Sequence, residues 1–599
     1  MVKPVISGVF FSQNPMTGTS EMVLECVQGD GSALVQEGVT PERWVARGNA
    51  WVARPEEGQL PIDVANQVRS KAQKIHKKIG KPIDLEWVYD GENFYWVQMR
   101  EITTERSLNI YSNRLSKDMM PGQIQPLIWS INVPLINSVW IEILEELVGD
   151  LSLQPEELAK DFYYRSYFNM GAFGQVFNKV GLPSEGLEMM MGVLPDQQGN
   201  PSFRPTFKLL GLLPRMLWFL RDKWTFERKI NRLFLEFQAQ IAEFNPKPDP
   251  SLTPENLLEQ IDNLYEVLPK IVYLNVVTPL LVTMYTRLLE GQLNKAGIDI
   301  KEFDVYHDLS ALDEFNPNFS LNKLTQCYSD LCHNREVTSL GWHELEGTEF
   351  LDEFKEFLRK FGHFSDNSNN FIAVPWREDP EIVLRMVQDQ FVNSIQTKKP
   401  DSRIGIDELS VKGFRKLMVR LFYQRVRRYS VYRDQVSYQY IYGYGLFRPY
   451  FLRIADWMVE KGWLAAQENI FILRWEEIKA AIRSNDGSGL LERVKTRIKE
   501  MDSFRDIDLP EVIYGEDVPP VFSQVHDRLS GTPTSQGYYQ GPVKIIHGSQ
   551  DFVKVEPGDV IVIPYSDVGW TPLFSRAGAV IAESGGLLSH SSIIAREYQ

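Results

Sequence analysis

The chain has 599 residues, 43% of them hydrophobic, which is enough for several domains with buried cores. Its formal net charge of −15 argues against nucleic-acid binding as the main activity. The three cysteines, Cys26, Cys327 and Cys332, form neither a disulfide framework nor a metal-spaced cluster, so we expect a cytoplasmic protein.

The first hundred residues predict short strands. Residues 5–12 and 22–26 are apolar runs that end at turns. Residues 84–89 and 93–100 alternate polar and apolar side chains on either side of Asp90-Gly91, a pattern typical of a β-hairpin.

The length of the hairpin loop decides whether Glu86 and Gln98 share a face. A two-residue loop sends them to opposite faces, whereas a three-residue loop over residues 90–92 leaves Gln98 and Arg100 on the face of Glu86. We predict the odd-numbered loop. A carboxylate and an amide oxygen suit magnesium that carries nucleotide phosphates, and an arginine beside them can bind a phosphate. The alternative is an ordinary half-exposed hairpin, which composition alone favours.

Residues 106–525 are mainly helical, with apolar side chains at spacings of three and four. The most apolar stretches, residues 209–220 and 271–285, are shorter than a membrane span, so we expect buried helices and no membrane. The basic run of residues 412–433 could bind an anion, but a solvated helix face is the favoured interpretation. His363 is interpreted as a structural histidine with satisfied hydrogen bonds.

Near the C-terminus, residues 558–564 and 577–582 predict strands, and Gly585-Gly586 precedes His590 and an apolar, helix-like segment. A helix start offers unpaired backbone N–H groups to an anion. A neutral imidazole there can act as a nucleophile and accept a phosphoryl group. The alternative is a capping histidine.

The sequence of this segment, Gly-Gly-Leu-Leu-Ser-His followed by Ala-Arg-Glu, resembles the motif of the phosphohistidine swivelling domain in the phosphoenolpyruvate-utilising family. The resemblance implies that His590 is the phospho-carrier. Asp84-Leu85-Glu86-Trp87 and Gln98-Met99-Arg100 resemble the second half of an ATP-grasp domain. This second resemblance implies that ATP and Mg²⁺ are cofactors, that Glu86 and Gln98 bind the metal, and that Arg100 contacts the phosphates. Ser32 and Glu101 depart from the family pattern, where a glutamate and a proline are usual.

The order of these segments resembles rifampicin-phosphotransferase-like proteins. It implies a multidomain fold, α/β plus all-α: a partial ATP-grasp domain over residues 1–105, a helical acceptor-binding domain with its linker over 106–525, and a partial swivelling domain over 526–599. By the same resemblance both ends look cut through domains. We therefore expect a longer parent enzyme and no ATP turnover by this stretch alone.

The implied reaction is that of a dikinase. ATP, water and a small-molecule acceptor give AMP, phosphate and a phosphorylated acceptor. Two alternatives stay open: a condensing ligase that activates its substrate by phosphorylation, and an inactive fragment or binding protein. The sequence does not name the acceptor, which could be pyruvate, an antibiotic or another metabolite.

Overall fold

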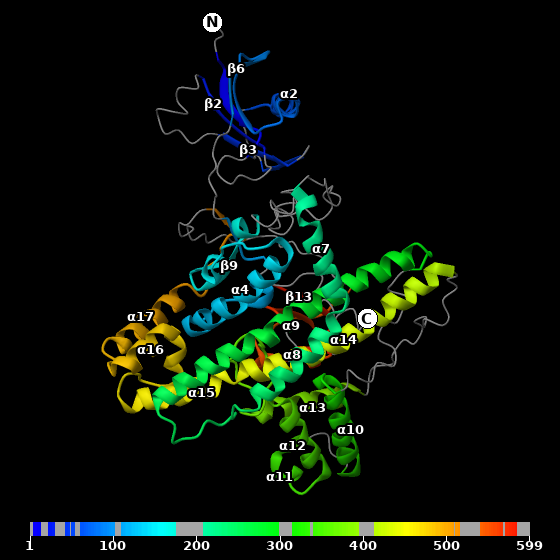
Figure 1. The fold of residues 1–599 in the computed structure, drawn as a ribbon, viewed down its shortest axis with the longest axis vertical. Coiled ribbons are helices and arrows are strands. Elements are labelled where there is room, and N and C mark those ends of the chain that lie inside the picture. Colours follow the sequence, from blue (N-terminus) through cyan, green and yellow to red (C-terminus); the bar gives the residue numbers. More distant parts are fainter. Residues whose placement is uncertain are drawn as a thin grey trace.

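The computed structural model describes residues 4–13, 22–29, 42–47, 50–53, 55, 60–101, 110–114, 116–174, 208–298, 314–335, 340–394, 413–507, 509–514, 539–566, 570–574 and 576–583. Figure 1 shows an N-terminal sheet at one end of the long axis and a large helical body at the other. A small C-terminal sheet lies against the body.

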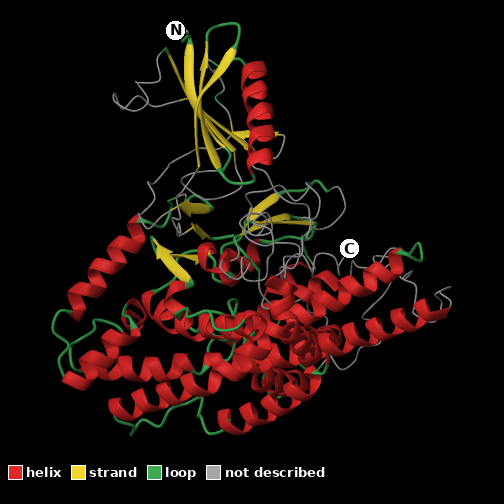
Figure 2. Ribbon diagram, turned by 45° about the horizontal axis from the view of Figure 1, so that its top comes forward, coloured by secondary structure: helices red, strands yellow, loops and turns green. Residues whose placement is uncertain are grey.

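The N-terminal sheet has six antiparallel strands in the order β4-β3-β2-β1-β5-β6. One face is apolar because alternate side chains, such as Phe10, Leu24 and Leu85, are fully buried. Helix α2 (Ile62–Ile79) covers that face, as Figure 2 shows. The other face carries the polar members of the alternation. The strands are β1 (Ile6–Phe11), β2 (Met22–Gln28), β3 (Glu42–Arg47), β4 (Ala50–Ala53), β5 (Ile83–Tyr89) and β6 (Phe94–Glu101).

The helical body is organised around two long helices, α9 (Pro254–Asn294) and α14 (Gly413–Gly445), which pack along each other (Figure 1). The Thr253 side chain accepts a hydrogen bond from Asn256 N and so caps the start of α9. Gly443 lets α14 approach α8 closely, since a Cβ there would lie 2.8 Å from Phe237 Cζ. The other helices are α3 (Ser116–Met119), α4 (Pro126–Val148), α7 (Lys208–Trp224), α8 (Phe226–Ile241), α10 (Pro317–Arg335), α11 (Trp342–Leu345), α12 (Glu349–Phe361), α13 (Pro380–Ser394), α15 (Phe447–Glu460), α16 (Trp475–Ser484) and α17 (Leu490–Ser503), with 3₁₀ turns η1 (Pro155–Glu157) and η5 (Gln467–Ile472).

Two of these helices, α4 and α9, are long and apolar enough to cross a membrane by length and composition. In their most apolar windows, 67% and 50% of the residues are buried inside the body. A buried core helix of a soluble protein passes the same test, so the two helices are weak evidence for a membrane. Of the two stretches predicted to be buried, residues 271–285 are confirmed at both ends, because Ile271 and Tyr285 are fully buried in α9. The prediction is wrong for residues 213–220 in α7, where Leu217 and Trp218 are exposed at 64% and 54%.

A second sheet has the strand order β10-β7-β9-β8. Its strands come from the beginning and the end of the helical region in the sequence. Its strands β7 (Ile110–Ser112) and β10 (Val512–Tyr514) pair although they are far apart in the sequence. This sheet was not predicted, because its strands are too short to show a clear alternation. The remaining two strands are β8 (Ala159–Phe162) and β9 (Arg165–Asn169).

The C-terminal sheet is parallel, with β11 (Val543–Ile545), β12 (Val560–Ile563) and β13 (Ala579–Ala582) in that order. Strands β12 and β13 confirm the two predicted near the C-terminus. The 3₁₀ turn η6 (Ser549–Lys554) and the short helix α18 (Thr571–Phe574) complete this part. Its buried residues, including Ile563, Trp570 and Phe574, form one continuous apolar cluster with the helical body. The C-terminal sheet is therefore docked on the body.

Candidate functional site

The hairpin of β5 and β6 places Glu86 directly opposite Gln98. The strands end at Tyr89 and resume at Phe94, so residues 90–93 form the loop. The predicted three-residue loop is therefore wrong. The reason is the Asp90 side chain, whose Oδ1 accepts hydrogen bonds from the backbone N–H groups of two later loop residues at 2.9 and 2.7 Å.

A bulge in β6 restores the predicted arrangement of faces. With an even-numbered loop and a regular ladder, Gln98 would lie on the face opposite to Glu86. The register shifts between Glu86 and Trp87, because Trp87 pairs with Trp96 while Glu86 pairs with Gln98, leaving Val97 as the extra residue. The prediction that Glu86, Gln98 and Arg100 share a face is thus confirmed, although the bulge and not the loop length is the cause.

Arg100 links the two predicted metal ligands. Its Nη2 donates a hydrogen bond to Gln98 Oε1 at 3.0 Å and lies 3.4 Å from Glu86 Oε1. The Arg100 side chain is 59% exposed and that of Glu86 37%, so solvent screens this ion pair. A phosphate could displace these contacts at little cost and take the guanidinium as its own partner.

Asp84 lies on the same face, opposite Arg100 in the ladder. Its Oδ1 is buried and has no hydrogen-bond partner in the described part of the chain. A buried oxygen left unpaired costs free energy, and it is satisfied only if a donor or a cation arrives with a ligand. Asp84 had no predicted role, although its even spacing from Glu86 is the signal that could have placed it on the same face.

The donor set fits a magnesium ion that binds together with phosphates. Within the described ranges, no group of three or more His, Cys, Asp or Glu side chains could hold a metal by itself. Magnesium is commonly held by one or two carboxylates plus waters and substrate phosphates. Glu86 and Gln98 supply two oxygen ligands of the right kind, and Asp84 supplies an unsatisfied oxygen nearby in the ladder.

His590 lies outside the described residues. The strand that precedes it in the sequence, β13, stays paired up to its carboxyl end, where Glu583 N donates to Ile563 O at 2.9 Å. The carboxyl ends of parallel strands form one edge of an open sheet, and ligands bind at such edges. His547 follows β11 at this same edge and is exposed.

Polar contacts fix the C-terminal sheet to the body. Trp570 Nε1 donates to Asp366 O at 3.1 Å, and Arg576 Nη1 lies 2.8 Å from Asp389 Oδ2 on α13. The side chain of Arg576 is 12% exposed. Burial raises the pKa of the Asp389 carboxyl, and the Arg576 guanidinium opposes that rise. Arg576 therefore keeps a partly buried carboxylate charged at this interface.

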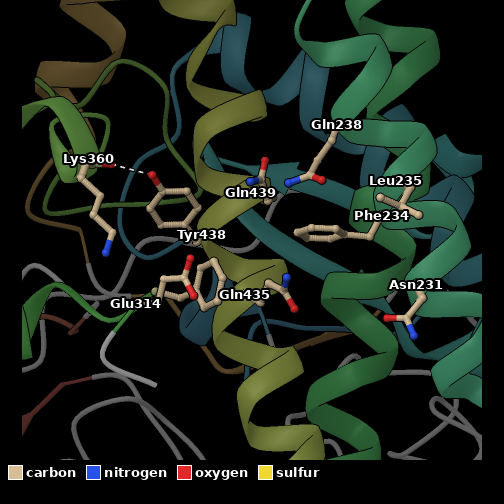
Figure 3. A pocket seen from close by; sticks show the side chains of 10 residues that line it. Asn231, Phe234, Leu235, Gln238, Glu314, Lys360, Gln435, Tyr438 and Gln439 are labelled. Atoms are coloured by element: carbon tan, nitrogen blue, oxygen red, sulfur yellow. Dashed lines mark hydrogen bonds between the residues drawn. The ribbon is translucent and has the colours of Figure 1, made fainter. Parts of the chain in front are cut away.

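A groove of about 550 Å³ runs between α8, α14 and the end of α12 (Figure 3). Three amide side chains, Gln238, Gln435 and Gln439, line it and make no hydrogen bonds in the described part of the chain. Phe234 and Tyr438 provide apolar surface, and the Tyr438 hydroxyl donates to Lys360 O at 2.7 Å. This volume and this mixture of rings and amides suit a small organic molecule.

Some arginines of the basic run on α14 contact neighbouring helices. Arg428 Nη1 lies 2.9 Å from Glu227 Oε2, and Arg425 Nη1 donates to Trp224 O at 2.9 Å while its guanidinium lies over the Trp224 ring. These contacts favour the structural interpretation for both arginines.

Comparison with known proteins supports the order of segments along the chain. Residues 321–434 match the model of the rifampicin phosphotransferase fourth domain, and residues 555–599 match that of the mobile domain of PEP-utilising enzymes. The second match includes His590.

Similarity to whole proteins extends over the full chain. An uncharacterized phosphotransferase of Bacillus subtilis, YvkC, is 23% identical over all of this chain and 76% of its own length. The rifampicin phosphotransferases of Bacillus subtilis and Streptomyces sviceus are each 22% identical over all of this chain, which covers 75% and 74% of their lengths.

Proposed function

Because the chain belongs to the rifampicin phosphotransferase and PEP-utilising enzyme family, we propose that it transfers a phosphoryl group from ATP to a small molecule through His590. The observation that carries this proposal is the match of the PEP-utilising mobile domain over residues 555–599, which contain that histidine. The face shared by Glu86, Gln98 and Arg100 supports it independently, since these side chains have the chemistry that a metal-bound nucleotide needs.

In this proposal the N-terminal hairpin binds the nucleotide. Glu86 and Gln98 hold Mg²⁺, and Arg100 releases Gln98 to bind a phosphate oxygen. The metal supplies charge neutralisation for the phosphates when it is bound. Asp84 contributes its unpaired oxygen through a water or directly.

The reaction has three transfers. A ring nitrogen of His590 attacks the β-phosphorus of ATP, and AMP leaves. Water then takes the terminal phosphoryl group, which leaves as inorganic phosphate. Finally an acceptor oxygen attacks the phosphorus that remains on His590, and the nitrogen–phosphorus bond breaks. A covalent carrier divides one difficult transfer into easier ones.

We place the acceptor in the groove lined by Tyr438. Its unpaired amides each offer a donor and an acceptor, and the side chains of Glu314 and Lys360 in its lining carry opposite charges. This set favours a neutral molecule with rings and hydroxyl or amide groups over a strongly charged one. Gln435→Leu and Gln439→Leu should each raise the KM for the acceptor.

Two alternatives give different products. A condensing ligase forms AMP and a joined product, and a binding protein forms no AMP. The test is a screen of candidate acceptors with the protein expressed from its complete gene, with AMP and product masses measured together. AMP with an acceptor 80 mass units heavier, the mass of a phosphoryl group, supports the proposal. AMP with a condensed product supports the ligase, and no AMP with any acceptor contradicts both enzymatic assignments.

A further inference from the structure

The loop between α12 and α13 lies under the docked C-terminal sheet. Besides the Trp570 bond to Asp366 O, Asn367 Nδ2 lies 3.4 Å from Tyr565 Oη, so adjacent loop residues touch both ends of the segment after β12. The ion pair between Arg576 and Asp389 holds the same sheet to α13. This loop therefore forms part of the surface of the helical body that contacts the C-terminal sheet.

A cleft of about 50 Å³ lies beside this loop. Its lining includes His363, Asn367, Asn370 and Arg377. Such a volume holds a few water molecules or one small oxyanion, and it is too small for a drug-sized acceptor. It is thus distinct in kind from the groove lined by Tyr438.

His363 is the unusual member of the cleft. The side chain is 6% exposed, and its Nε2 has no hydrogen-bond partner in the described part of the chain. The rings of Phe364, Tyr438 and Tyr442 surround it at centroid distances of 4.8, 4.7 and 5.4 Å. The interpretation as a structural histidine is confirmed by its burial and by its hydrogen bonding to the backbone of Lys360 and Tyr438, but Nε2 has no partner among the described residues.

Burial, assisted by the Arg377 guanidinium, lowers the pKa of His363 to about 3. The imidazole is therefore neutral near pH 7, and its hydrogen bonding to the backbone of Lys360 and Tyr438 uses its one N–H, so the unpaired Nε2 is an acceptor for an O–H group. A buried polar atom without a partner destabilises the fold unless a ligand or a water satisfies it.

The charges that line the cleft leave one cation unpaired. Arg448 binds the Glu378 carboxylate at 3.0 and 3.1 Å and Ile372 O at 2.7 Å. The Arg377 backbone N donates to Gly362 O at 2.8 Å, whereas its guanidinium forms no hydrogen bond or ion pair with other described residues. With Glu378 neutralised by Arg448 and His363 neutral, the cleft has a net positive charge from Arg377.

Asn370 supplies a further donor. Its Oδ1 accepts a hydrogen bond from Ile372 N at 3.0 Å, while its amide nitrogen makes none among the described residues. Two donor groups without side-chain partners, from Asn370 and Arg377, and the unpaired Nε2 of His363 thus line one small cleft. Guanidinium and amide N–H groups donate to the oxygens of tetrahedral oxyanions, and the O–H of a protonated oxyanion can donate to Nε2.

We propose that this cleft binds a tetrahedral oxyanion in the helical body, beside the loop that contacts the C-terminal sheet. The ion is inorganic phosphate or the phosphoryl group of a phosphomonoester. The phosphomonoester source rests on the proposed function, because the product of that reaction carries such a group; the phosphate source does not.

The test uses inorganic phosphate and glycerol 2-phosphate as probes, without ATP, so it is independent of catalysis. Binding to the whole protein is measured by isothermal titration calorimetry, and the shift of Tm with ligand is measured in parallel. Arg377→Gln removes the unpaired charge at a solvent-exposed residue and leaves the buried His363 in place. Arg385→Gln on α13 is the matched control, since Arg385 is exposed and pairs with Glu381 outside the cleft.

We expect Arg377→Gln to weaken binding by about tenfold, the usual effect of losing one charge-assisted hydrogen bond, and Arg385→Gln to leave it unchanged. Tighter binding of glycerol 2-phosphate identifies the phosphoryl group of a product as the ligand. Binding of phosphate alone identifies free phosphate. Absence of binding by both probes, or equal binding by wild type and Arg377→Gln, overturns the proposal.

Discussion

The hairpin face around Arg100 and the cleft lined by His363 and Arg377 both offer arginine and amide groups that could bind a phosphate. They differ in how far these groups are exposed to solvent. On the hairpin, Arg100 is exposed and already forms a hydrogen bond with Gln98 and an ion pair with Glu86. In the cleft, His363 is buried and its Nε2 has no partner. The exposed site can exchange its internal contacts for a ligand at little cost, whereas the buried site is left unsatisfied until a ligand or water fills it.

The two regions also differ in how they are assembled. The hairpin is local, because all of its candidate ligands come from two adjacent strands. The cleft is assembled from distant parts of the helical body, because the loop after α12 and the junction of α14 and α15 both line it. Binding at the hairpin therefore depends on strand parity, and binding at the cleft depends on how the helices pack.

The largest effect is expected from Glu86→Gln, which removes the charge of a proposed metal ligand of the hairpin. We expect AMP formation by the protein expressed from its complete gene to fall on the order of 100-fold, as for other losses of a charge that faces the reacting phosphates. Glu92→Gln, in the exposed hairpin loop, is the control and should retain activity. Equal activities of the two variants would show that Glu86 does not hold the metal.

Two deletions in β6 test strand parity. Val97 and Met99 are both exposed, at 62% and 51%. Deleting Val97 removes the bulge residue and keeps Gln98 and Arg100 on the face of Glu86, so nucleotide affinity should be preserved. Deleting Met99 moves Arg100 to the covered face, and affinity should fall about tenfold through loss of its phosphate contact. A fluorescent ATP analogue measures both, and the opposite ranking would contradict the register-based assignment.

A smaller effect is expected at the docking interface. Arg576→Gln leaves the Asp389 carboxylate partly buried without its partner, so docking of the C-terminal sheet should weaken, by roughly threefold in the docked-to-undocked ratio. Fluorescence of Trp570 reports the docked state.

The pH dependence of that variant has a defined sign. The pKa of Asp389 is raised by burial, and loss of Arg576 raises it further. Because the protonated form carries no charge to bury, docking of Arg576→Gln should recover as the pH falls through this raised pKa. Docking that weakens further on acidification would rule out Asp389 as the responsible group.

Much of the hairpin could be predicted from the sequence because alternation is a local property. Residues 84–100 predict two strands. The parity of the residue numbers leaves two possibilities, with Glu86 and Gln98 on the same face or on opposite faces of the hairpin. The loop was mispredicted because the Asp90 side chain bonds two backbone N–H groups beyond it, and the bulge at Val97 has no signal in composition.

The interface could not be predicted in this way. The contacts of Trp570 with Asp366 and of Arg576 with Asp389 join segments whose separation along the chain carries no periodic signal. The unsatisfied Nε2 of His363 is likewise visible only when the surrounding rings are in place. The role of His590 rests on its motif and on the family match, and it stays a prediction.

The most direct measurement is transfer of label from ATP that carries ³²P at the β-phosphate to the protein expressed from its complete gene. The phosphohistidine mechanism predicts an acid-labile, alkali-stable label on the wild type and on His547→Ala, the exposed histidine at the same sheet edge. It predicts none on His590→Ala. Stable labelling of the His590→Ala protein, or continued formation of AMP and phosphorylated acceptor by it, would contradict the phosphohistidine mechanism.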